Sequence, residues 1–455
     1  MTKDYFQIGG CAVLLAVLCL WSLSLVAWAT EYPRIGAEPL LPVPGVAAKA
    51  GAPRLDVDPA TALVLELPPL DPASEGLPPV DGKRHVVGIA RNLPDDLRKR
   101  MDPAALPWQP LAGGGHGAVL VVTSPGARAL RLEVELRTLP GEGVLRFFAP
   151  DSGEVLLQLD AWEALAAGTG QLWSPIVQGD SVGLEITLPA GVDPARVDLA
   201  VGRVSHFPGG HPAHKALRNI GDAASCNVDV ACSAATPRGV VDSVAKYAFT
   251  DLDGFTVLCT GNLLNDTDPA TQQPYFLTAR HCINNVVAAA SMELYWFFQR
   301  ERCGGPAPTD VVTQFGGADL LVSDFGSDHS LVLLNRTPPD GAVLGGWDSA
   351  PVAANTPVVA LHHPSGDLKK LSLGVVEGAA PFVEPVDGEG NFLLARWRLG
   401  TTEGGSSGSG IFQPQGAEAP YLVGVLSGGL ASCRARTQPD WYGRFVRAFP
   451  RMRDF

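Results

Sequence analysis

The stretch GGSSGSGIF, residues 404–412, decides between two very different interpretations of this chain. Small residues at this density are typical of a flexible linker, but the string runs directly into Ile411 and Phe412, which predict a strand entering a core. Glycine permits sharp backbone turns that aim consecutive N–H groups at one point, and an acyl-transfer enzyme needs such donors behind an exposed hydroxyl. We therefore interpret the string as a nucleophile loop.

Two further stretches carry residues that packing alone does not require. The run FLTARHC ends an apolar strand at His281, and DHSLVLL places Asp328 directly before another strand, where a carboxylate can orient an imidazole. Each signal is weak by itself, because single histidines are commonly structural and aspartates commonly form turns. The order His281, Asp328, Ser407 is that of the two-barrel serine proteases, whereas other serine hydrolase folds use different orders.

Length and composition limit the alternatives. The chain has 455 residues, enough for roughly two or three domains. Its formal net charge of −13 argues against nucleic acid as a partner, because phosphate binding needs a basic face. The 51 glycines and 39 prolines favour turn-rich β structure over long helices.

The N-terminus has the features of an export signal. No residue between Tyr5 and Thr30 is charged, and Ala27-Trp28-Ala29 has the small-x-small form of a cleavage site. We expect residues 1–29 to be a signal peptide and the protein to be secreted, either outside the cell or into the periplasm. The same run is long enough to span a bilayer, so a membrane-anchored form with an uncleaved segment is the alternative.

The rest of the chain divides into four segments by composition. Proline-rich sequence such as LPPLDPASEGLPPV predicts an extended linker or arm over 30–84. The run ALRLEVELRTL alternates between an apolar face (Leu130, Leu132, Val134, Leu136) and a charged face (Arg131, Glu133, Glu135, Arg137), which predicts a half-buried strand. With its neighbours it predicts a β-sandwich-like pro-domain over 85–206, followed by an exposed, cleavable linker over 207–220.

Residues 221–455 predict a second β-rich domain. YAFTDLDGFTVLCTGNLL contains Asp253-Gly254, a hairpin-type turn between two alternating runs. Many short strands and few helices favour two barrels or a large sandwich. Of the eight cysteines, Cys11 and Cys19 lie in the signal and the other six in this half. An exported protein with this pattern is expected to form three disulfides. The zinc alternative is weak because no two cysteines are separated by two to four residues, as in the C-x2-4-C pairs of zinc sites.

Residues 221–455 resemble the bacterial lysyl endopeptidases, which are serine proteases of the trypsin (chymotrypsin) fold. The shared motifs, in chain order, are SCNVDVAC, CTGNLL, YFLTARHC, DHSLVLL, GWD, LHHPSGDLKKLS, TEGGSSGSGIF, GVLSGG and DWYGR. The resemblance implies an all-β fold of two antiparallel β-barrels. It also implies a secreted serine endopeptidase that cleaves after basic residues, Lys in particular, through an acyl-enzyme and without cofactor or metal. We expect a monomer whose partners are polypeptide substrates and its own pro-domain.

The resemblance also implies roles for individual residues. Ser407 would be the nucleophile, His281 the general base and Asp328 the orienting carboxylate; Asp324 is a rival for that last role, but the sequence after Asp328 matches the family better. The oxyanion hole would use the N–H groups of Gly405 and Ser407. Asp440, before WYGR, would receive the substrate cation; a surface aspartate after Pro439 is the alternative. The remaining implied residues are the substrate-pairing strand Ser427, Gly428 and Gly429, and the disulfides Cys226–Cys433, Cys232–Cys303 and Cys259–Cys282.

The sequence departs from the family in four places. Ser427 stands where the family has His, and FVEPVDGEG stands where it has a loop with Trp. The segment between Cys433 and Asp440 is two residues shorter, and the C-terminal segment is cut to RFVRAFPRMRDF. Preference for Lys over Arg is therefore less secure than preference for a basic residue, and a broader trypsin-like specificity is an alternative.

Three other functions are alternatives to a protease. A non-catalytic, peptide-binding homologue would usually lose one member of the triad, and all three residues are present. An α/β-hydrolase esterase would place Ser before Asp and His and would alternate strands with helices. A ligand-binding function of the 85–206 sandwich has no support beyond its fold type.

Overall fold

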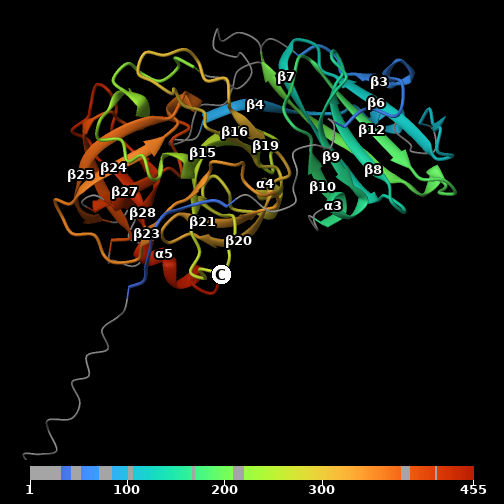
Figure 1. Ribbon diagram of the computed structural model, residues 1–455. Helices are drawn as coiled ribbons and strands as arrows, with labels where there is room; N and C mark the ends of the chain where they lie inside the picture. Colours follow the sequence, from blue (N-terminus) through green and yellow to red (C-terminus); the bar gives the residue numbers. More distant parts are fainter. Residues whose placement is uncertain are drawn as a thin grey trace, which may run out of the picture. The chain divides into compact units, whose positions relative to one another are not determined.

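The computed structural model describes residues 32–41, 53–70, 85–100, 106–166, 170–208, 220–380, 390–415 and 418–455. Within it, Arg34–Phe455 form one compact unit built mostly from antiparallel strands (Figure 1). The expected signal peptide, and the expected cleavable linker from 209 to 219, lie outside the described residues. No helix in the described ranges is long and apolar enough to cross a membrane.

A two-layer sandwich precedes the second half of the chain. Its two sheets share one core, in which Leu120 and Phe147 of one layer pack with Leu132 and Leu199 of the other. The strand orders are β3-β6-β12-β8-β9, with β5 beside β6, and β10-β7-β13-β4, with β11 beside β7. The strands of the first layer are β3 (Leu63–Glu66), β5 (Gln109–Pro110), β6 (His116–Thr123), β8 (Val144–Ala149), β9 (Glu154–Asp160) and β12 (Ser181–Leu188). Those of the second are β4 (His85–Asn92), β7 (Ala127–Thr138), β10 (Gln171–Trp173), β11 (Val177–Gln178) and β13 (Asp198–Pro208).

The charged face of β7 differs from the expected exposed face. Arg131 and Glu133 are 2% and 3% exposed. Arg131 is covered because its guanidinium reaches into the second half of the chain, where Nη1 donates to Thr250 Oγ1 (3.2 Å) and Nη2 to the Ser291 carbonyl. Glu133 accepts from Arg203 Nε at 2.7 Å. On the charged face, Arg131 and Glu133 are therefore buried, whereas Arg137 at the end of the strand is exposed, as the alternation predicts.

The first barrel joins the sandwich through a shared sheet. Strand β4 pairs with β13 of the sandwich on one side and with β16 of the barrel on the other, where Thr256 lies opposite Gly88. The barrel's own strands follow in the order β19-β18-β15-β16-β17-β21-β20 around Tyr247, Phe276 and Trp296. These strands are β15 (Val244–Thr250), β16 (Thr256–Leu264), β17 (Tyr275–Ala279), β18 (Glu293–Trp296), β19 (Val312–Gln314), β20 (Ala318–Asp324) and β21 (His329–Leu334).

The hairpin expected at Asp253-Gly254 connects β15 to β16, and Gly254 has a φ of 84°, which is accessible mainly to glycine.

The second barrel is a closed ring. Its strands run in the order β28-β27-β24-β25-β26-β29, and β29 pairs again with β28. Val358, Leu393 and Tyr442 fill its interior. The strands are β24 (Pro357–His362), β25 (Lys370–Ala380), β26 (Phe392–Leu399), β27 (Gly410–Gln415), β28 (Glu418–Gly429) and β29 (Asp440–Arg444). The fold is thus all-β, with two barrels after a sandwich, as expected.

Short elements complete the unit. The predicted arm contributes β1 (Arg34–Ile35) and β2 (Glu38–Pro39), which pair with β23 (Trp347–Asp348) and β22 (Val343–Leu344), while β14 (Val228–Asp229) pairs with β25. The α-helices are α2 (Asp95–Arg100), α3 (Ala161–Ala166), α4 (Val286–Ala290) and α5 (Phe445–Met452). The 3-10 turns are η1 (Pro59–Thr61), η4 (Pro194–Arg196), η5 (Val230–Cys232), η6 (Val241–Ser243) and η7 (Pro364–Gly366).

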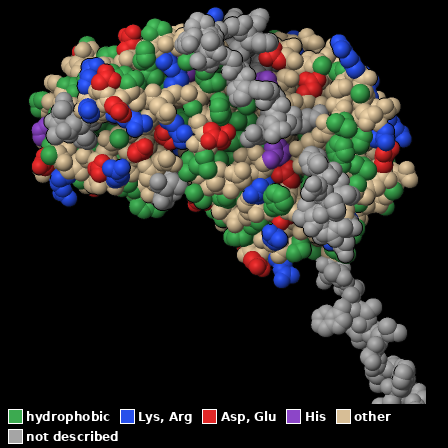
Figure 2. Space-filling model, turned by 180° about the vertical axis from the view of Figure 1, so that it is seen from behind, with side chains coloured by type: hydrophobic (Ala, Val, Ile, Leu, Met, Phe, Trp, Pro, Cys, Tyr) green, Lys and Arg blue, Asp and Glu red, His purple; other side chains and the backbone are tan. Residues whose placement is uncertain are grey.

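The charge of the chain is spread over its surface. Figure 2 shows acidic and basic side chains interspersed on one face, where the described side chains form no continuous basic area.

Three disulfides connect the second half of the chain. They are Cys226–Cys433, Cys232–Cys303 and Cys259–Cys282, the same pairs that the family resemblance implies. The last one ties β16 to the residue that follows His281 and so fixes the end of β17.

Because all six of these cysteines are paired, we predict that the mature protein contains no free thiol. Titration with a thiol reagent after unfolding without reductant should read near zero, and the reduced sample supplies the control. A reading of two thiols from a chain that retains Cys11 and Cys19 is consistent with this scheme. Two or more from a chain that begins after residue 29 would contradict the pairing.

Candidate active site

The loop around Ser407 has the sharp geometry that the glycines predicted. Gly405 and Gly408 have φ values of 89° and 81°. A Cβ at Gly405 would lie 2.9 Å from the His363 carbonyl oxygen, and one at Gly408 would lie 2.1 Å from Thr278 Oγ1. Only glycine fits both the conformation and the space. The string 404–412 is therefore a packed loop that enters β27.

Two residues of β16 fix this loop from below. The N–H of Thr260 donates to the Ser407 carbonyl (2.8 Å), and its hydroxyl donates to the Gly405 carbonyl (2.9 Å). Asn262 Nδ2 donates to the Gly408 carbonyl at 3.0 Å. Both side chains are fully buried. Both residues belong to the motif CTGNLL. This motif is one of those shared with the family, but the sequence did not predict its contact with the loop around Ser407.

The three residues of the predicted triad lie in one hydrogen-bonded row. His281 Nε2 lies 2.8 Å from Ser407 Oγ, and His281 Nδ1 lies 2.7 Å from Asp328 Oδ2. Asp328 Oδ1 also accepts from the His281 N–H at 2.9 Å. His281 follows β17 and Asp328 precedes β21, and these two strands pair side by side. The first barrel thus sets the imidazole and carboxylate, while the second barrel supplies the hydroxyl.

Asp328 is held as a carboxylate. Burial raises its pKa, but the charge of His281 and the hydrogen bonds from His281 and Ser427 outweigh burial, and the pKa of Asp328 is lowered overall. Ser427 Oγ donates to Asp328 Oδ2 at 2.5 Å. An ionised Asp328 can hold the imidazole in one tautomer and stabilise it when it is protonated.

The rival carboxylate points elsewhere. Asp324 Oδ2 accepts from the N–H of Ser327 at 3.0 Å, and Oδ1 pairs with Arg451 Nη1 at 2.9 Å. Within the described residues, its hydrogen bonds and its ion pair go to Ser327 and Arg451 and not to the imidazole of His281. Asp324 therefore stabilises the turn that carries Asp328.

A second Ser–His pair, Ser406 and His362, lies beside Ser407 and His281. Comparing the two shows what distinguishes the pair that contains His281. Ser406 Oγ is 2.9 Å from His362 Nδ1, but the other nitrogen of this ring is 3.0 Å from the hydroxyl of Ser372. A hydroxyl does not stabilise a protonated imidazole as a carboxylate does. The arrangement at His281 is the one suited to activating a serine.

Two backbone donors lie beside Ser407 without an internal acceptor. In the described part of the chain, the N–H groups of Gly405 and Ser407 donate to no protein oxygen, whereas those of Ser406, Gly408 and Ser409 do. Unsatisfied backbone donors next to a nucleophile are what an oxyanion hole requires.

Asp440 is a fully buried carboxylate in β29. Its Oδ2 accepts from Trp397 Nε1 and from Thr402 Oγ1, each at 2.7 Å, and its Oδ1 accepts from the Ala431 N–H at 3.2 Å. Gly429 lies against it, since a Cβ there would be 1.8 Å from Oδ1. The alternative of a surface aspartate is thus inconsistent with its position.

Sequence reasoning missed Trp397 and Thr402 as partners of this carboxylate. Both lie on stretches already singled out, Trp397 in the strand FLLARWRL and Thr402 at the start of TEGGSSGSGIF. The order of residues along the chain does not indicate that these two side chains donate to the Asp440 carboxylate.

The predicted substrate-pairing residues have an open edge. Gly428 and Gly429 pair with β29 on one side, and β27 on the other side ends its pairing at Val425. No described strand pairs with Ser427–Gly429 along that second edge. An extended peptide can add there as a further strand.

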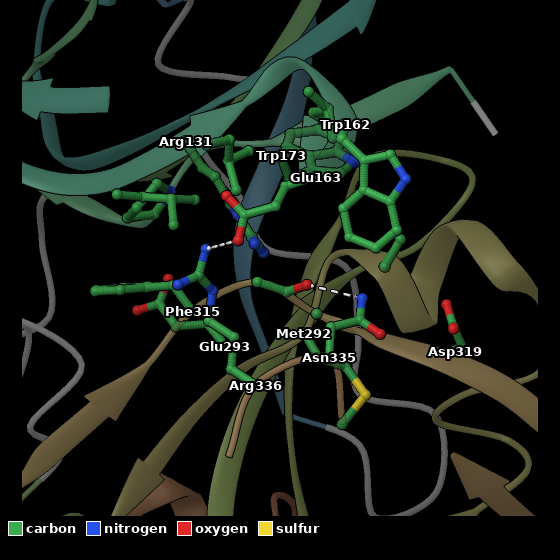
Figure 3. A pocket seen from close by; sticks show the side chains of 17 residues that line it. Arg131, Trp162, Glu163, Trp173, Met292, Glu293, Phe315, Asp319, Asn335 and Arg336 are labelled. Atoms are coloured by element: carbon green, nitrogen blue, oxygen red, sulfur yellow. Dashed lines mark hydrogen bonds and ion pairs between the residues drawn. The ribbon is translucent and has the colours of Figure 1, made fainter. Parts of the chain in front are cut away.

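A separate cavity lies between the sandwich and the first barrel (Figure 3). Trp173 and Met292 line it, and the ion pair of Glu163 with Arg336 (3.0 Å) crosses it. None of the triad residues lines this cavity, which belongs to the contact between the two halves of the chain. Among the described residues, no cluster of three or more His, Cys, Asp or Glu side chains has the arrangement of a metal site.

Comparisons with known proteins match both halves of the chain. Residues 220–443 match the family described as lysyl endopeptidase, C-terminal domain, and residues 70–208 match the lysyl endopeptidase N-terminal domain. A lysyl endopeptidase of Pseudomonas aeruginosa is 33% identical over 374 residues, which cover 79% of this chain and 78% of the relative.

Solved structures with some similarity are also proteases. The HtrA-type protease AlgW with a tripeptide has a TM-score of 0.32 and 13% identity, over 47% of this chain and 60% of that one. An inactive form of Rv3671c from M. tuberculosis has a TM-score of 0.31 and 16% identity, over 48% of this chain and 88% of that one.

The two Ser–His pairs allow a direct chemical test. Diisopropyl fluorophosphate should label Ser407 and not Ser406, because the imidazole beside Ser407 is backed by the Asp328 carboxylate, whereas the ring nitrogens of His362 lie beside two hydroxyls. Ser407→Ala should abolish labelling, while Ser406→Ala, the matched neighbour, should retain it. Peptide mapping by mass spectrometry identifies the modified residue, and labelling at Ser406 would contradict the assignment.

Proposed function

Since the chain belongs to the lysyl endopeptidase family and is a serine endopeptidase, we propose that Ser407, His281 and Asp328 are its catalytic residues and that it cleaves after basic residues, Lys in particular. The row of hydrogen bonds from Asp328 through His281 to Ser407 is the observation that carries the proposal. Three disulfides and the family membership support a location outside the cytoplasm.

The geometry supports a two-step acyl transfer. Ser407 Oγ forms a bond to the scissile carbonyl carbon while His281 Nε2 takes its proton. The N–H groups of Gly405 and Ser407 receive the negative charge that develops on the carbonyl oxygen. His281 then gives the proton to the leaving amine as the C–N bond breaks, and water repeats the sequence to release the acid and restore Ser407.

Asp440 supplies the basis for selecting a cation. Three donors hydrogen-bond to its carboxylate inside the barrel, and only glycine fits at 429, since a Cβ there would lie 1.8 Å from Oδ1. A buried carboxylate favours a substrate ammonium or guanidinium strongly over an apolar side chain. A compact ammonium and a planar guanidinium need different pocket shapes, and the family resemblance favours Lys.

Two departures from the family concern the neighbouring subsites. Ser427 here donates to Asp328, so the position that carries His in the family takes part in holding the triad carboxylate. The loop FVEPVDGEG lies outside the described residues except for Gly390. We propose that substrate preference beyond the basic residue differs from that of relatives with His and Trp at these places.

We further propose that the chain is a zymogen with residues 1–29 as signal, 85–206 as pro-domain and 221–455 as protease. The described protease half begins at Ile220, and the Gly221 and Ala223 N–H groups donate to the buried carboxylate of Asp367 at 3.0 and 3.2 Å. The expected cleavage region before it contains Lys215 and Arg218. The pro-domain acts as an intramolecular partner: Arg131 donates to the Ser291 carbonyl.

Specificity can be tested at Asp440. Asp440→Asn should lower kcat/KM for substrates with Lys by more than a hundredfold, about 3 kcal/mol, because the substrate cation loses its buried partner. Cleavage after Phe or Leu should change far less. Digestion of a denatured protein, with the C-termini of the peptides read by mass spectrometry, gives the ratio directly.

The matched control for this experiment is Asp324→Asn, which alters another buried carboxylate away from Asp440. It should leave the ratio of Lys to Phe cleavage unchanged. A wild-type enzyme that cuts after Phe or Leu as readily as after Lys would show that Asp440 does not select the substrate.

Maturation can be tested with the nucleophile variant. Ser407→Ala should lower turnover by on the order of a millionfold. If the enzyme processes itself, wild type should acquire an N-terminus between 216 and 221 while the variant stays full length after signal removal. N-terminal sequencing of both from a protease-deficient host decides the matter, and equal processing of the two would argue against self-cleavage.

A further inference from the structure

The predicted arm contains a short segment, residues 34–41, that lies along the protease half of the chain. Its strand β1 pairs with β23, with Ile35 opposite Trp347, and its strand β2 pairs with β22, with Glu38 opposite Leu344. The Leu40 N–H adds a hydrogen bond to the Ala342 carbonyl at 3.0 Å. A proline-rich segment thus adopts an extended conformation through main-chain pairing with another part of the chain.

An arginine of this segment covers a buried acid. Arg34 donates from Nε to Asp348 Oδ2 at 2.7 Å and from a second nitrogen to the same oxygen. The Asp348 side chain is 5% exposed, whereas that of Arg34 is 47% exposed. The guanidinium also lies over the ring of Tyr421, 5.1 Å from its centroid. The acid is therefore part of the protease half, and its partner comes from the arm.

Two side chains of the protease half, Gln272 and Asn265, form hydrogen bonds with the arm, and each of them contacts its backbone. Gln272 accepts from the Leu41 N–H (2.7 Å) and donates to Glu38 Oε1 (2.8 Å). Asn265 Nδ2 donates to the Gly36 carbonyl at 2.9 Å. Contacts to backbone atoms fix the register of an extended peptide, as in other cases of strand addition.

Apolar contacts complete the surface. Ile35 and Ala37 pack against the core cluster that includes Trp347 and Phe445. Gly346 permits a close approach, because a Cβ there would lie 2.7 Å from the Ala37 nitrogen and from the Ile35 carbonyl oxygen.

We propose that this surface, formed by β22, β23, Asn265, Gln272 and Tyr421, is a peptide-binding groove of the protease domain. Its ligand is the part of the arm from residue 34 to residue 41, which docks independently of the sandwich. The sandwich contacts other elements, through β4 on β16 and Arg131 at Ser291. The proposal requires neither catalysis nor processing.

Independent docking makes the region before residue 209 a bivalent ligand of the protease half. Two attachments joined by one chain bind far more persistently than either alone, because release of one leaves the other holding it nearby. The arm's share of this attachment rests on the ion pair of Arg34, on the hydrogen bond to Glu38, on backbone pairing and on the apolar contacts of Ile35 and Ala37.

The test supplies the arm in trans. A chain that lacks residues 30–41 and carries Ser407→Ala is titrated with a fluorescent peptide of residues 30–41, and binding is followed by anisotropy. We expect saturable binding, and at least tenfold weaker binding of the peptide with Arg34→Ala. The undeleted Ser407→Ala chain is the control and should bind less peptide, because its own arm occupies the groove.

Asp348→Asn in the deleted chain completes a double-mutant cycle. It should weaken binding of the unaltered peptide at least tenfold and should affect the Arg34→Ala peptide little, since the pair is already broken. Absence of saturable binding to a folded deleted chain would overturn the proposal. Equal binding of the two peptides would do the same.

A second measurement covers the case in which the deletion prevents folding. In the full chain with Ser407→Ala, the further change Arg34→Ala should accelerate hydrogen exchange at residues 34–40 and leave exchange in β4 unchanged. Acceleration of both segments together, or of neither, would show that the arm does not dock as a separate element. Because catalysis is absent throughout, the result is independent of the proposed substrate specificity.

Discussion

The carboxylate of Asp328 is the point at which the two barrels become one site. It accepts the N–H and the imidazole of His281 from the first barrel and the hydroxyl of Ser427 from the second. Its backbone has a φ of 56°, a conformation that is costly for a residue with a side chain. The surrounding contacts hold it: Asp324 caps the preceding turn through Ser327, and the Arg280 N–H donates to the Asp328 carbonyl at 3.0 Å. If that turn moved, His281 would lose its orientation relative to Ser407.

A second buried acid, Asp440, is likewise surrounded by several hydrogen-bond donors. Inside the second barrel, an indole, a hydroxyl and a backbone N–H donate hydrogen bonds to the carboxylate of Asp440. Burying an isolated carboxylate is costly, whereas one with several donors is tolerated and becomes a strong site for a cation. Gly429 is needed for a related reason, since any side chain there would collide with Oδ1.

The sequence was most informative where chemistry restricts the residue types. The glycines around Ser407 and the order of His281, Asp328 and Ser407 predicted that these three residues lie together, and the structure brings them into one hydrogen-bonded row. Alternation in β7 predicted the strand and its apolar face. It could not predict that Arg131 on the other face is buried, because periodicity reports which residues share a face and not what covers that face. The partners of Asp440 and the docked position of Arg34 were missed for the same reason, since both depend on contacts between distant segments.

The bond Cys226–Cys433 has a topological consequence. Its cysteines are 207 residues apart in the sequence, so the first barrel and every strand of the second barrel except β29 lie within a single covalent ring. A break in one peptide bond of that ring opens it into a linear chain whose two pieces stay attached through sulfur. Fragments that remain together can keep their contacts, because the entropy lost on reassociation is that of a tethered chain and not of two free molecules. For a protease that meets other copies of itself, a single internal cut need not separate the imidazole from the serine.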